Sequence, residues 1–294
     1  MMCGMQWNEL LQEVNARHQT TFALGKRYEA GEQGAFVIVD QKGRRGVLKW
    51  TPDSKAIDKL EQARAVTARL RERGYPAPRY LYVDEALSGT YSIQHAIEGS
   101  PIPLDEIAEY IPHLLKLNAL QVGQALPGLP DWHREVVNTV LFGGDGYCLH
   151  SSLQHYTPAT ATLLTDLQQI VSVHRDAPHR THDIVHSDFQ HANILVHNSQ
   201  IVGVVDWDAV HAGDCAFDIA TLLFYSNDDH TVCEQLWHSA LERANIELLS
   251  VYLAHLILRQ VDWSLRHHDQ STIDHYLNRS NKILAALTMR LKHL

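Results

Sequence analysis

The segment from His186 to Asp208, HSDFQHANILVHNSQIVGVVDWD, constrains the fold more than any other part of this 294-residue chain. Its two apolar runs, Ile194–Val196 and Ile201–Val205, flank a short polar turn, and this pattern predicts a β-hairpin. Carboxylate and amide side chains stand at both ends of the hairpin: Asp188, Asn193, Asp206 and Asp208. We therefore expect the hairpin to bring these polar groups to one reaction site.

These residue types are the ones that phosphoryl transfer requires. One carboxylate orients and deprotonates the attacking hydroxyl, while an amide oxygen and a further carboxylate hold the Mg²⁺ ion of the nucleotide. In the pattern HxDxxxxN, Asp188 and Asn193 lie on one tight loop, and Asp206 follows the second strand of the hairpin. A polar turn without catalytic function would explain one half of the segment but not both. The segment therefore predicts a kinase.

Composition and charge narrow the range of partners. Hydrophobic residues make up 45% of the chain and charged residues 20%, which suffices for a sizeable core. The net charge of −9 disfavours nucleic acid and anionic membranes as partners and is compatible with a cationic small-molecule substrate. The 20 histidines form no HExxH pattern and the 4 cysteines no CxxC pair, so we expect reduced thiols and no dedicated metal cage.

The same sequence features bear on location. The chain has no run of about 18 apolar residues, and its first residues turn polar and acidic within one helical stretch. We therefore expect a cytoplasmic protein without a membrane span or a secretory signal. The sequence leaves open whether it is a monomer or a homodimer.

Strand patterns dominate the first part of the chain. A glycine turn joins two of them, and Gly31 and Gly34 could let backbone amides approach a phosphate or simply make the turn. A further apolar strand ends near Lys49. Its ammonium group suits the α- and β-phosphates of a nucleotide, and a solvated strand end is the alternative.

A long amphipathic helix is predicted from Ser54 to Arg73. On this helix Glu61 is the best candidate to pair with Lys49, and Asp58 is the reserve. The strand Thr90–Ile97 then runs into a short linker, which could present backbone groups to an adenine edge or connect two lobes.

Beyond this linker the patterns are mostly helical. We predict an N-terminal nucleotide-binding lobe of residues 1–98, a hinge at about residues 93–99, and a C-terminal catalytic and substrate-binding lobe of residues 99–294. Residues 121–157 show the least clear organisation, and we expect there an insertion that covers part of the second substrate's site.

Three motifs in matching order carry a resemblance to a known family. HSDFQHAN, VVDWD and GDCAFDIA correspond to HGDxxxxN, IDW or IDF, and GDPxxDLA of the aminoglycoside phosphotransferase and choline kinase-like family. The likeness extends more loosely over most of residues 20–225. It implies an α+β, bilobal protein-kinase-like fold, with a small antiparallel β-sheet and one long helix in the N-lobe and a larger, mainly α-helical C-lobe.

The resemblance also implies a small-molecule kinase that uses ATP or GTP with Mg²⁺. Asp188 is then expected to be the catalytic base, and Asn193 and Asp206 the ligands of Mg²⁺. His186 and Asp218 are expected to brace the catalytic loop through hydrogen bonds.

On the nucleotide side, the resemblance implies that Lys49, oriented by Glu61, holds the phosphates. The backbone of His95 and Ile97 is expected to meet the purine. Glu61 lies further ahead of the Pro-x-Pro that follows the helix than the family's ion-pair glutamate does. Ser187 and Cys215 also depart from the family pattern, since they replace a glycine or asparagine and a proline.

Acidic residues of the second lobe suggest the substrate class. With Trp263 as a cation–π or stacking face, the candidates are Asp208, Asp228, Asp229 and Asp262. Helix caps and solvated carboxylates are the alternative roles. We predict transfer of the γ-phosphate to a hydroxyl of a cationic antibiotic, an aminoglycoside or a viomycin-type cyclic peptide, which would confer resistance. The alternatives are a metabolic kinase for choline, ethanolamine, homoserine or a sugar, and a catalytically silent nucleotide-binding module.

Overall fold

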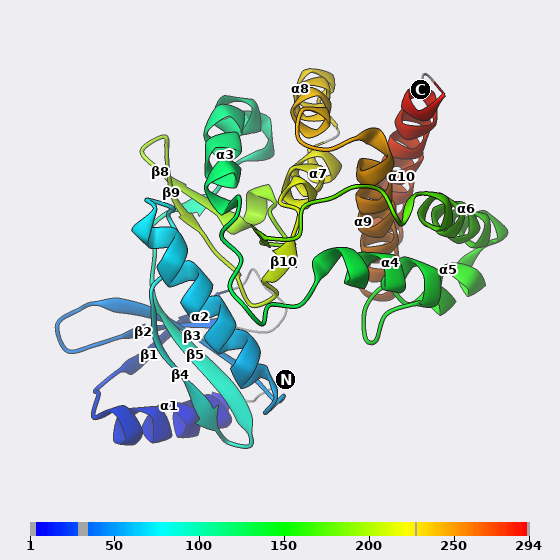
Figure 1. Ribbon diagram of the computed structural model, residues 1–294. Helices are drawn as coiled ribbons and strands as arrows, with labels where there is room; N and C mark the ends of the chain where they lie inside the picture. Colours follow the sequence, from blue (N-terminus) through cyan, green and yellow to red (C-terminus); the bar gives the residue numbers. More distant parts are fainter. Residues whose placement is uncertain (1–3, 29–34, 227, 293–294) are drawn as a thin grey trace. The chain divides into compact units, whose positions relative to one another are not determined.

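The computed structural model describes residues 4–28, 35–226 and 228–292, so Gly31 and Gly34 lie outside the described residues. The chain forms two compact units (Figure 1). The first consists of Met1–Pro101 and Ile194–Val210, and the second of Ile102–Asn193 and His211–Leu294. The predicted boundary near residue 98 left the hairpin in the second unit, whereas the structure groups it with the first.

The first unit is built on a five-stranded antiparallel sheet of order β1-β2-β3-β5-β4. Its strands are β1 (Ala23–Arg27), β2 (Ala35–Val39), β3 (Arg45–Thr51), β4 (Tyr80–Ala86) and β5 (Gly89–His95). Helix α1 (Gly4–His18) buries Leu10 and Val14 in one cluster with Leu48 and Ile93 of the sheet. Helix α2 (Ala56–Glu72) packs against β4 and β5.

The predicted hairpin is confirmed and forms a second, three-stranded sheet in the first unit. Strand β8 (Ile194–His197) pairs with both β6 (Ser100–Pro101) and β9 (Gln200–Val204). The turn residues Asn198 and Ser199 both have positive φ, 48° and 59°, as the tight turn of a twisted hairpin requires. The N–H of Val204 donates to the carbonyl of Pro76 at 2.8 Å, which ties the hairpin to the chain after α2.

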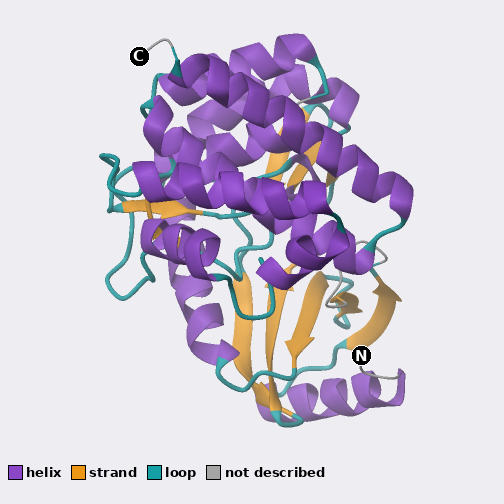
Figure 2. Ribbon diagram, turned by 90° about the vertical axis from the view of Figure 1, so that its right-hand side faces the viewer, coloured by secondary structure: helices purple, strands orange, loops and turns teal. Residues whose placement is uncertain are grey.

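The second unit is almost wholly helical (Figure 2). Its helices are η1 (Leu104–Glu106), α3 (Ile107–Gln121), α4 (Trp132–Phe142), α5 (His150–Tyr156), α6 (Pro158–His174), η2 (His191–Asn193), α7 (Ala216–Tyr225), α8 (His230–Leu241), α9 (Ile246–His267) and α10 (Gln270–Leu291). Helix α9 is buried on nearly all sides because α4 to α8 and α10 pack around it. Strands β7 (Asp183–Val185) and β10 (His211–Gly213) form a short antiparallel pair.

The α+β fold class is confirmed: an antiparallel sheet with one long helix precedes a mainly helical part. Residues 121–157 contain α4 and α5, and both helices pack against α9. Within the described ranges, no helix is long and apolar enough to span a membrane.

Candidate active site

Asp188 lies in the loop after β7, and three side chains of the second unit bind its carboxylate. Asn193 Nδ2 donates to Asp188 Oδ2 at 2.7 Å, and Gln190 Nε2 donates to both carboxylate oxygens at 3.0 Å. Arg259 of α9 donates from Nη2 to Oδ1 at 3.2 Å. The carboxylate is thus oriented from several directions, yet the side chain keeps 33% of its surface exposed. An acceptor hydroxyl can reach a base in this setting.

Asp218 of α7 supports this loop from below. The side chain is fully buried, and its carboxylate accepts hydrogen bonds from the backbone N–H groups of His186 and Ser187, both at 3.0 Å. Gln121 Nε2 donates a third at 2.7 Å. Burial raises the pKa of Asp218, while the charge of His186 and these donors lower it. This is the geometry expected of the bracing role, and His186 is itself buried within the loop.

Ser187 occupies a conformation that favours glycine. Its φ is +68°, in the left-handed region where a side chain crowds the backbone. Arg259 Nη1 donates to the carbonyl of Ser187 at 2.7 Å, which secures this turn. The departure from the family's glycine or asparagine therefore leaves the loop shape in place at some cost in strain.

A buried group of Asp183, Asp214 and Cys215 lies beside the same β7–β10 pair. All four carboxylate oxygens accept backbone N–H groups, from Gly123, Cys215, Ala216 and Arg180. The group is therefore a structural brace. Cys215 donates its own N–H to Asp183 at 3.3 Å, a bond that the family's proline could not make.

The first unit presents a cation between two carboxylates. Lys49 Nζ of β3 lies 2.6 Å from Asp206 Oδ1 and 3.0 Å from Asp208 Oδ2. Tyr80 donates its hydroxyl to the other oxygen of Asp208 at 3.2 Å. Burial alone would lower the pKa of Lys49, but the charges of Asp208 and Asp206 raise it above its ordinary value. Asp206 has a φ of +69°, a strained backbone of the kind that functional sites retain.

These groups suit Mg²⁺, which prefers oxygen ligands. Asp206 and Asp208 offer carboxylate oxygens on the first unit. Asn193 uses its amide nitrogen on Asp188, and among the described residues its amide oxygen makes no hydrogen bond. Each unit by itself therefore offers oxygen atoms of the kind that bind Mg²⁺: carboxylate oxygens on the first and an amide oxygen on the second.

The expected pairing of Glu61 with Lys49 is not formed. Among the residues that the structure describes, the ion-pair partner of Glu61 is Arg64, at 2.8 Å one turn along α2. Lys49 is instead paired with Asp206 and Asp208. Asp208, predicted to face the acceptor substrate, is therefore paired with the cation that was predicted to hold the nucleotide phosphates.

One backbone group of the predicted hinge has a partner in the structure. The N–H of His95 donates to the carbonyl of Arg79 at 2.8 Å, within the first unit, while contact of the Ile97 backbone with a purine stays a prediction. Ile97 fills the space above Gly203 of β9, where a Cβ atom would stand 2.9 Å from Ile97 Cδ1. The side chain of Ile97 thus fixes the linker to the hairpin.

The acidic residues expected to bind a cationic substrate are largely occupied. Asp262 is fully buried and pairs in bidentate fashion with Arg266, at 2.8 and 2.9 Å. Asp229 caps α8 by accepting from Val232 N at 3.0 Å. Asp262 is therefore a correction, since a buried ion pair leaves no free carboxylate for substrate, whereas Asp229 is exposed and uses one oxygen as a helix cap, so its role toward substrate stays a prediction.

Asp228 and Trp263 also have partners within the second unit. Asp228 forms an ion pair with Arg279. The ring of Trp263 stacks on His267 at 3.9 Å and lies under the guanidinium of Arg266 at 5.4 Å. The predicted stacking face is therefore already used by a cation of the chain itself.

Sequence reasoning missed four side chains of this site. They are Tyr80, Gln121, Gln190 and Arg259. Gln190 lies inside the motif, and its amide donors so near Asp188 were a usable signal. The other three lie 71 to 128 positions from their partners, so no local pattern predicts these contacts.

Solved structures with the same fold define the class. An aminoglycoside phosphotransferase APH(4)-Ia, in ternary complex with ADP and hygromycin B, matches with a TM-score of 0.71 and 18% identity over 93% of this chain and 97% of that one. Choline kinase LicA from Streptococcus pneumoniae matches with a TM-score of 0.70 and 13% identity over 96% and 99%. The fold is therefore that of the protein-kinase-like small-molecule phosphotransferases.

The sequence itself places the chain within this class. A family model described as the phosphotransferase enzyme family matches residues 25–252, and the chain belongs to this family. A hygromycin-B 4-O-kinase of Escherichia coli is 23% identical over 213 residues, which is 66% of this chain and 60% of that protein's length. The predicted family and the predicted class of enzyme, a phosphotransferase, are both confirmed.

Proposed function

We propose that this protein transfers the γ-phosphoryl group of a nucleoside triphosphate to a hydroxyl of an aminoglycoside-type antibiotic. The observation that carries the proposal is the Asp188 carboxylate, held by Asn193, Gln190 and Arg259 and still open to solvent. A positioned carboxylate of this kind accepts the proton of an attacking hydroxyl.

In this proposal the two units divide the work. Lys49 of the first unit exchanges its carboxylate partners for phosphate oxygens. Asp206, Asp208 and Asn193 are the residues that would hold Mg²⁺, which would neutralise phosphate charge. Asp188 of the second unit orients the acceptor hydroxyl and takes its proton as the new oxygen–phosphorus bond forms and the bond from the γ-phosphorus to the leaving nucleoside diphosphate breaks. Little covalent work is left to the protein, because positioning and electrostatics dominate this reaction. Such a protein would work in the cytoplasm, where nucleotide is supplied.

The acceptor class rests on likeness and on charge. The curated relative is named for phosphorylation of hygromycin B, and the structural neighbour holds ADP and hygromycin B. The net charge of −9 favours approach of a polycationic aminoglycoside over that of an anionic substrate.

A metabolic alcohol is the second candidate acceptor. It is favoured by the occupied state of Asp228, Asp229 and Asp262, which leaves fewer carboxylates to bind a polycation. Arg259 also places positive charge beside Asp188. A kinase for a smaller amino alcohol or a sugar would not require a large acidic cleft.

Transfer of phosphate from ATP and from GTP to a panel of acceptors tests the proposal. The panel contains hygromycin B, other aminoglycosides, a viomycin-type peptide, a macrolide, choline, ethanolamine, homoserine and simple sugars. We expect turnover with an aminoglycoside, which Asp188→Asn abolishes. The matched control is Asp176→Asn, an exposed aspartate of the same unit whose loss should leave turnover unchanged. Turnover with the metabolic alcohols alone would establish the second candidate, and Mg-nucleotide binding without any turnover would indicate a silent module.

A further inference from the structure

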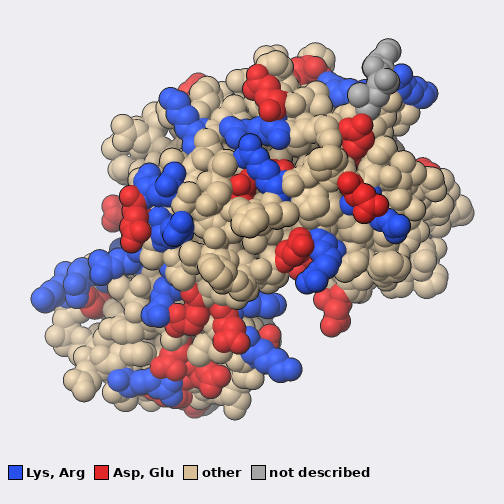
Figure 3. Space-filling model, in the orientation of Figure 1, with Lys and Arg blue, Asp and Glu red and all other residues tan. Residues whose placement is uncertain are grey.

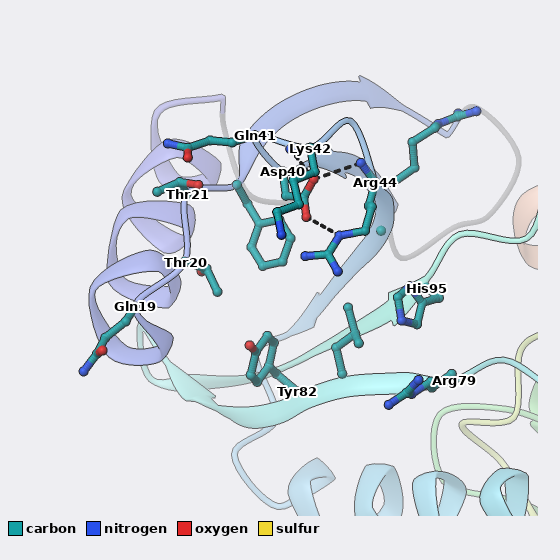
Figure 4. A pocket seen from close by; sticks show the side chains of 14 residues that line it. Gln19, Thr20, Thr21, Asp40, Gln41, Lys42, Arg44, Arg79, Tyr82 and His95 are labelled. Atoms are coloured by element: carbon teal, nitrogen blue, oxygen red, sulfur yellow. Dashed lines mark hydrogen bonds and ion pairs between the residues drawn. The ribbon is translucent and has the colours of Figure 1, made fainter.

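The first unit has a hollow whose residues the proposed reaction does not use (Figure 4). Its volume is about 450 Å³, a size suited to a small organic ligand. The walls come from the loop after α1, the β2–β3 hairpin and the ends of β4 and β5. The lining includes cationic side chains, among them Lys42, Arg44 and Arg79, and aromatic ones, Phe22 and Tyr82.

The hollow lies on the opposite face of the sheet from Lys49. Successive side chains of a strand point to opposite faces, so positions 46 and 49 of β3 face apart. Gly46 is paired with Ile38 and His95, and it forms part of the floor of the hollow. A Cβ atom at Gly46 would stand 3.1 Å from Ile38 Cγ1, so glycine keeps this floor open. The hollow is thus distinct from the candidate nucleotide site.

The side chains that line this hollow carry more positive than negative charge. Three cationic side chains, those of Lys42, Arg44 and Arg79, line the hollow with one carboxylate, Asp40, which leaves an excess of two positive charges. Arg45 borders the hollow, but alternation along β3 turns its side chain to the face of Lys49. Asp40 is already bound to Arg44 Nε at 2.6 Å. Among the described residues, Lys42 and Arg79 form no ion pair. Lys and Arg side chains gather over the β2–β3 hairpin at the left edge of the first unit (Figure 3).

The positive charge around the hollow lowers the pKa values of two neighbouring side chains. The pKa of His95 is lowered, first by burial and then by the charges of Arg79 and Arg44. The pKa of Arg71 is lowered by burial and by Arg79. In a chain with a net charge of −9, such a concentration of unpaired cations calls for an anion.

The hollow also offers apolar surface beside the cations. Phe22, Leu81 and Tyr82 line it and are only partly buried. The ring of Tyr82 is fixed from its other side by His18, which stacks on it at 3.9 Å. One arginine guanidinium can bind two phosphate oxygens at once, and an aromatic ring in a fixed position can stack on a flat apolar group.

We propose that this hollow binds a small organic phosphate, a molecule with an apolar or aromatic body and a phosphate group of two negative charges. Arg79 and Lys42 hold the phosphate, and Phe22 and Tyr82 contact the body. The site is separate from the proposed catalytic function, so it can exist whatever the acceptor substrate is.

Calorimetric titration of the full chain with phenyl phosphate tests the proposal. We expect saturable binding that Arg79→Glu weakens by about tenfold or more, because a charge-assisted hydrogen bond is lost and repulsion is added. Lys59→Glu, the same charge change at an exposed position of α2, should leave the affinity unchanged, and so should Lys49→Ala on the opposite face of the sheet. Melting curves establish that each variant is folded. Inorganic phosphate, which lacks the apolar body, should bind about tenfold more weakly.

Three outcomes overturn the proposal. The first is the absence of saturable phenyl phosphate binding to the unaltered protein. The second is binding that survives in Arg79→Glu but disappears in Lys49→Ala, which would place the ligand at the nucleotide face. The third is equal affinity for inorganic and phenyl phosphate, which would exclude recognition of an organic body. A second charge reversal, Lys42→Glu, repeats the test if Arg79→Glu does not fold.

Discussion

The candidate site residues fall into two halves, one in each unit, and the two halves hold their carboxylates in different ways. In the first unit, Asp206 and Asp208 face the cation Lys49, and their side chains are 50% and 29% exposed. In the second unit, the loop around Asp188 rests on Asp218, which is fully buried and bound to backbone N–H groups. The exposed ion pairs can exchange partners at little cost, whereas the buried bonds fix one geometry. The first half is thus suited to releasing and binding phosphates, and the second to aiming a base.

Neutralising Asp188 tests the second half most severely. We expect Asp188→Asn to lower kcat by about 10³- to 10⁴-fold, since the base is lost while the amide preserves the shape of the loop. Binding of Mg-nucleotide, measured by calorimetry, should remain close to that of the unaltered protein. Asp206→Asn should instead weaken Mg-nucleotide binding. Equal losses of nucleotide affinity in both variants would abolish the distinction between the halves.

The difference in rigidity predicts a difference in stability. Asp218→Ala leaves two buried N–H groups without an acceptor and should lower the free energy of unfolding by about 2–4 kcal/mol. Asp206→Ala removes one side of a half-exposed ion pair and should change it by about 1 kcal/mol or less. Urea denaturation measures both values. A loss of similar size in the two variants would contradict the comparison.

Acid should lower the stability of the second unit through the buried His255 of α9. Burial lowers the pKa of His255 to about 3, so the folded protein keeps this ring neutral, while the unfolded chain takes up a proton below about pH 6.5. His255 therefore has no effect on the free energy of unfolding well above pH 6.5. As the pH falls below 6.5 toward 3, the unfolded chain is increasingly favoured by proton uptake and stability decreases. Between pH 7 and pH 5 the expected loss is about 2 kcal/mol. His255→Phe, which keeps the ring contacts with Trp132 and Phe217, should remove this loss. The same substitution at the exposed His238 should not.

The smallest expected effect concerns a feature that both halves share. Ser187 and Asp206 each have a φ near +70°. Ser187→Gly should raise the free energy of unfolding by about 0.5–1 kcal/mol, because glycine adopts this conformation without strain. Ser187→Ala keeps the strain and serves as the control. If glycine does not stabilise the protein relative to alanine, backbone strain at this position is unimportant.

Local patterns were enough to predict the catalytic loop, the hairpin and the strand of Lys49. Each of these depends on residues close together in the chain, such as the five-residue spacing of Asp188 and Asn193. Apolar periodicity predicted the helical part for the same reason, since α9 buries residues along its whole length.

Side-chain partners over long separations could not be predicted. Glu61 lay on the expected helix, but its choice of Arg64 over Lys49 depends on how α2 is turned against the sheet. Asp262 was predicted to bind substrate, yet Ser152 and Arg266, which lie 110 and 4 positions away in the sequence, enclose its carboxylate. Arg259 gave no signal, since the turn of α9 that brings it to Asp188 is set by packing of the whole second unit.

The interleaved order of the two units has a consequence for synthesis on the ribosome. The first unit begins at the N-terminus, but its hairpin and Asp206 come from residues 194–210. Residues 102–193 of the second unit are therefore synthesised before residues 194–210, which complete the first unit. Domains usually fold as they emerge, N-terminal first. Here the strands of the five-stranded sheet all lie within residues 23–95, but Lys49 can pair with Asp206 only after a further 157 residues have been translated.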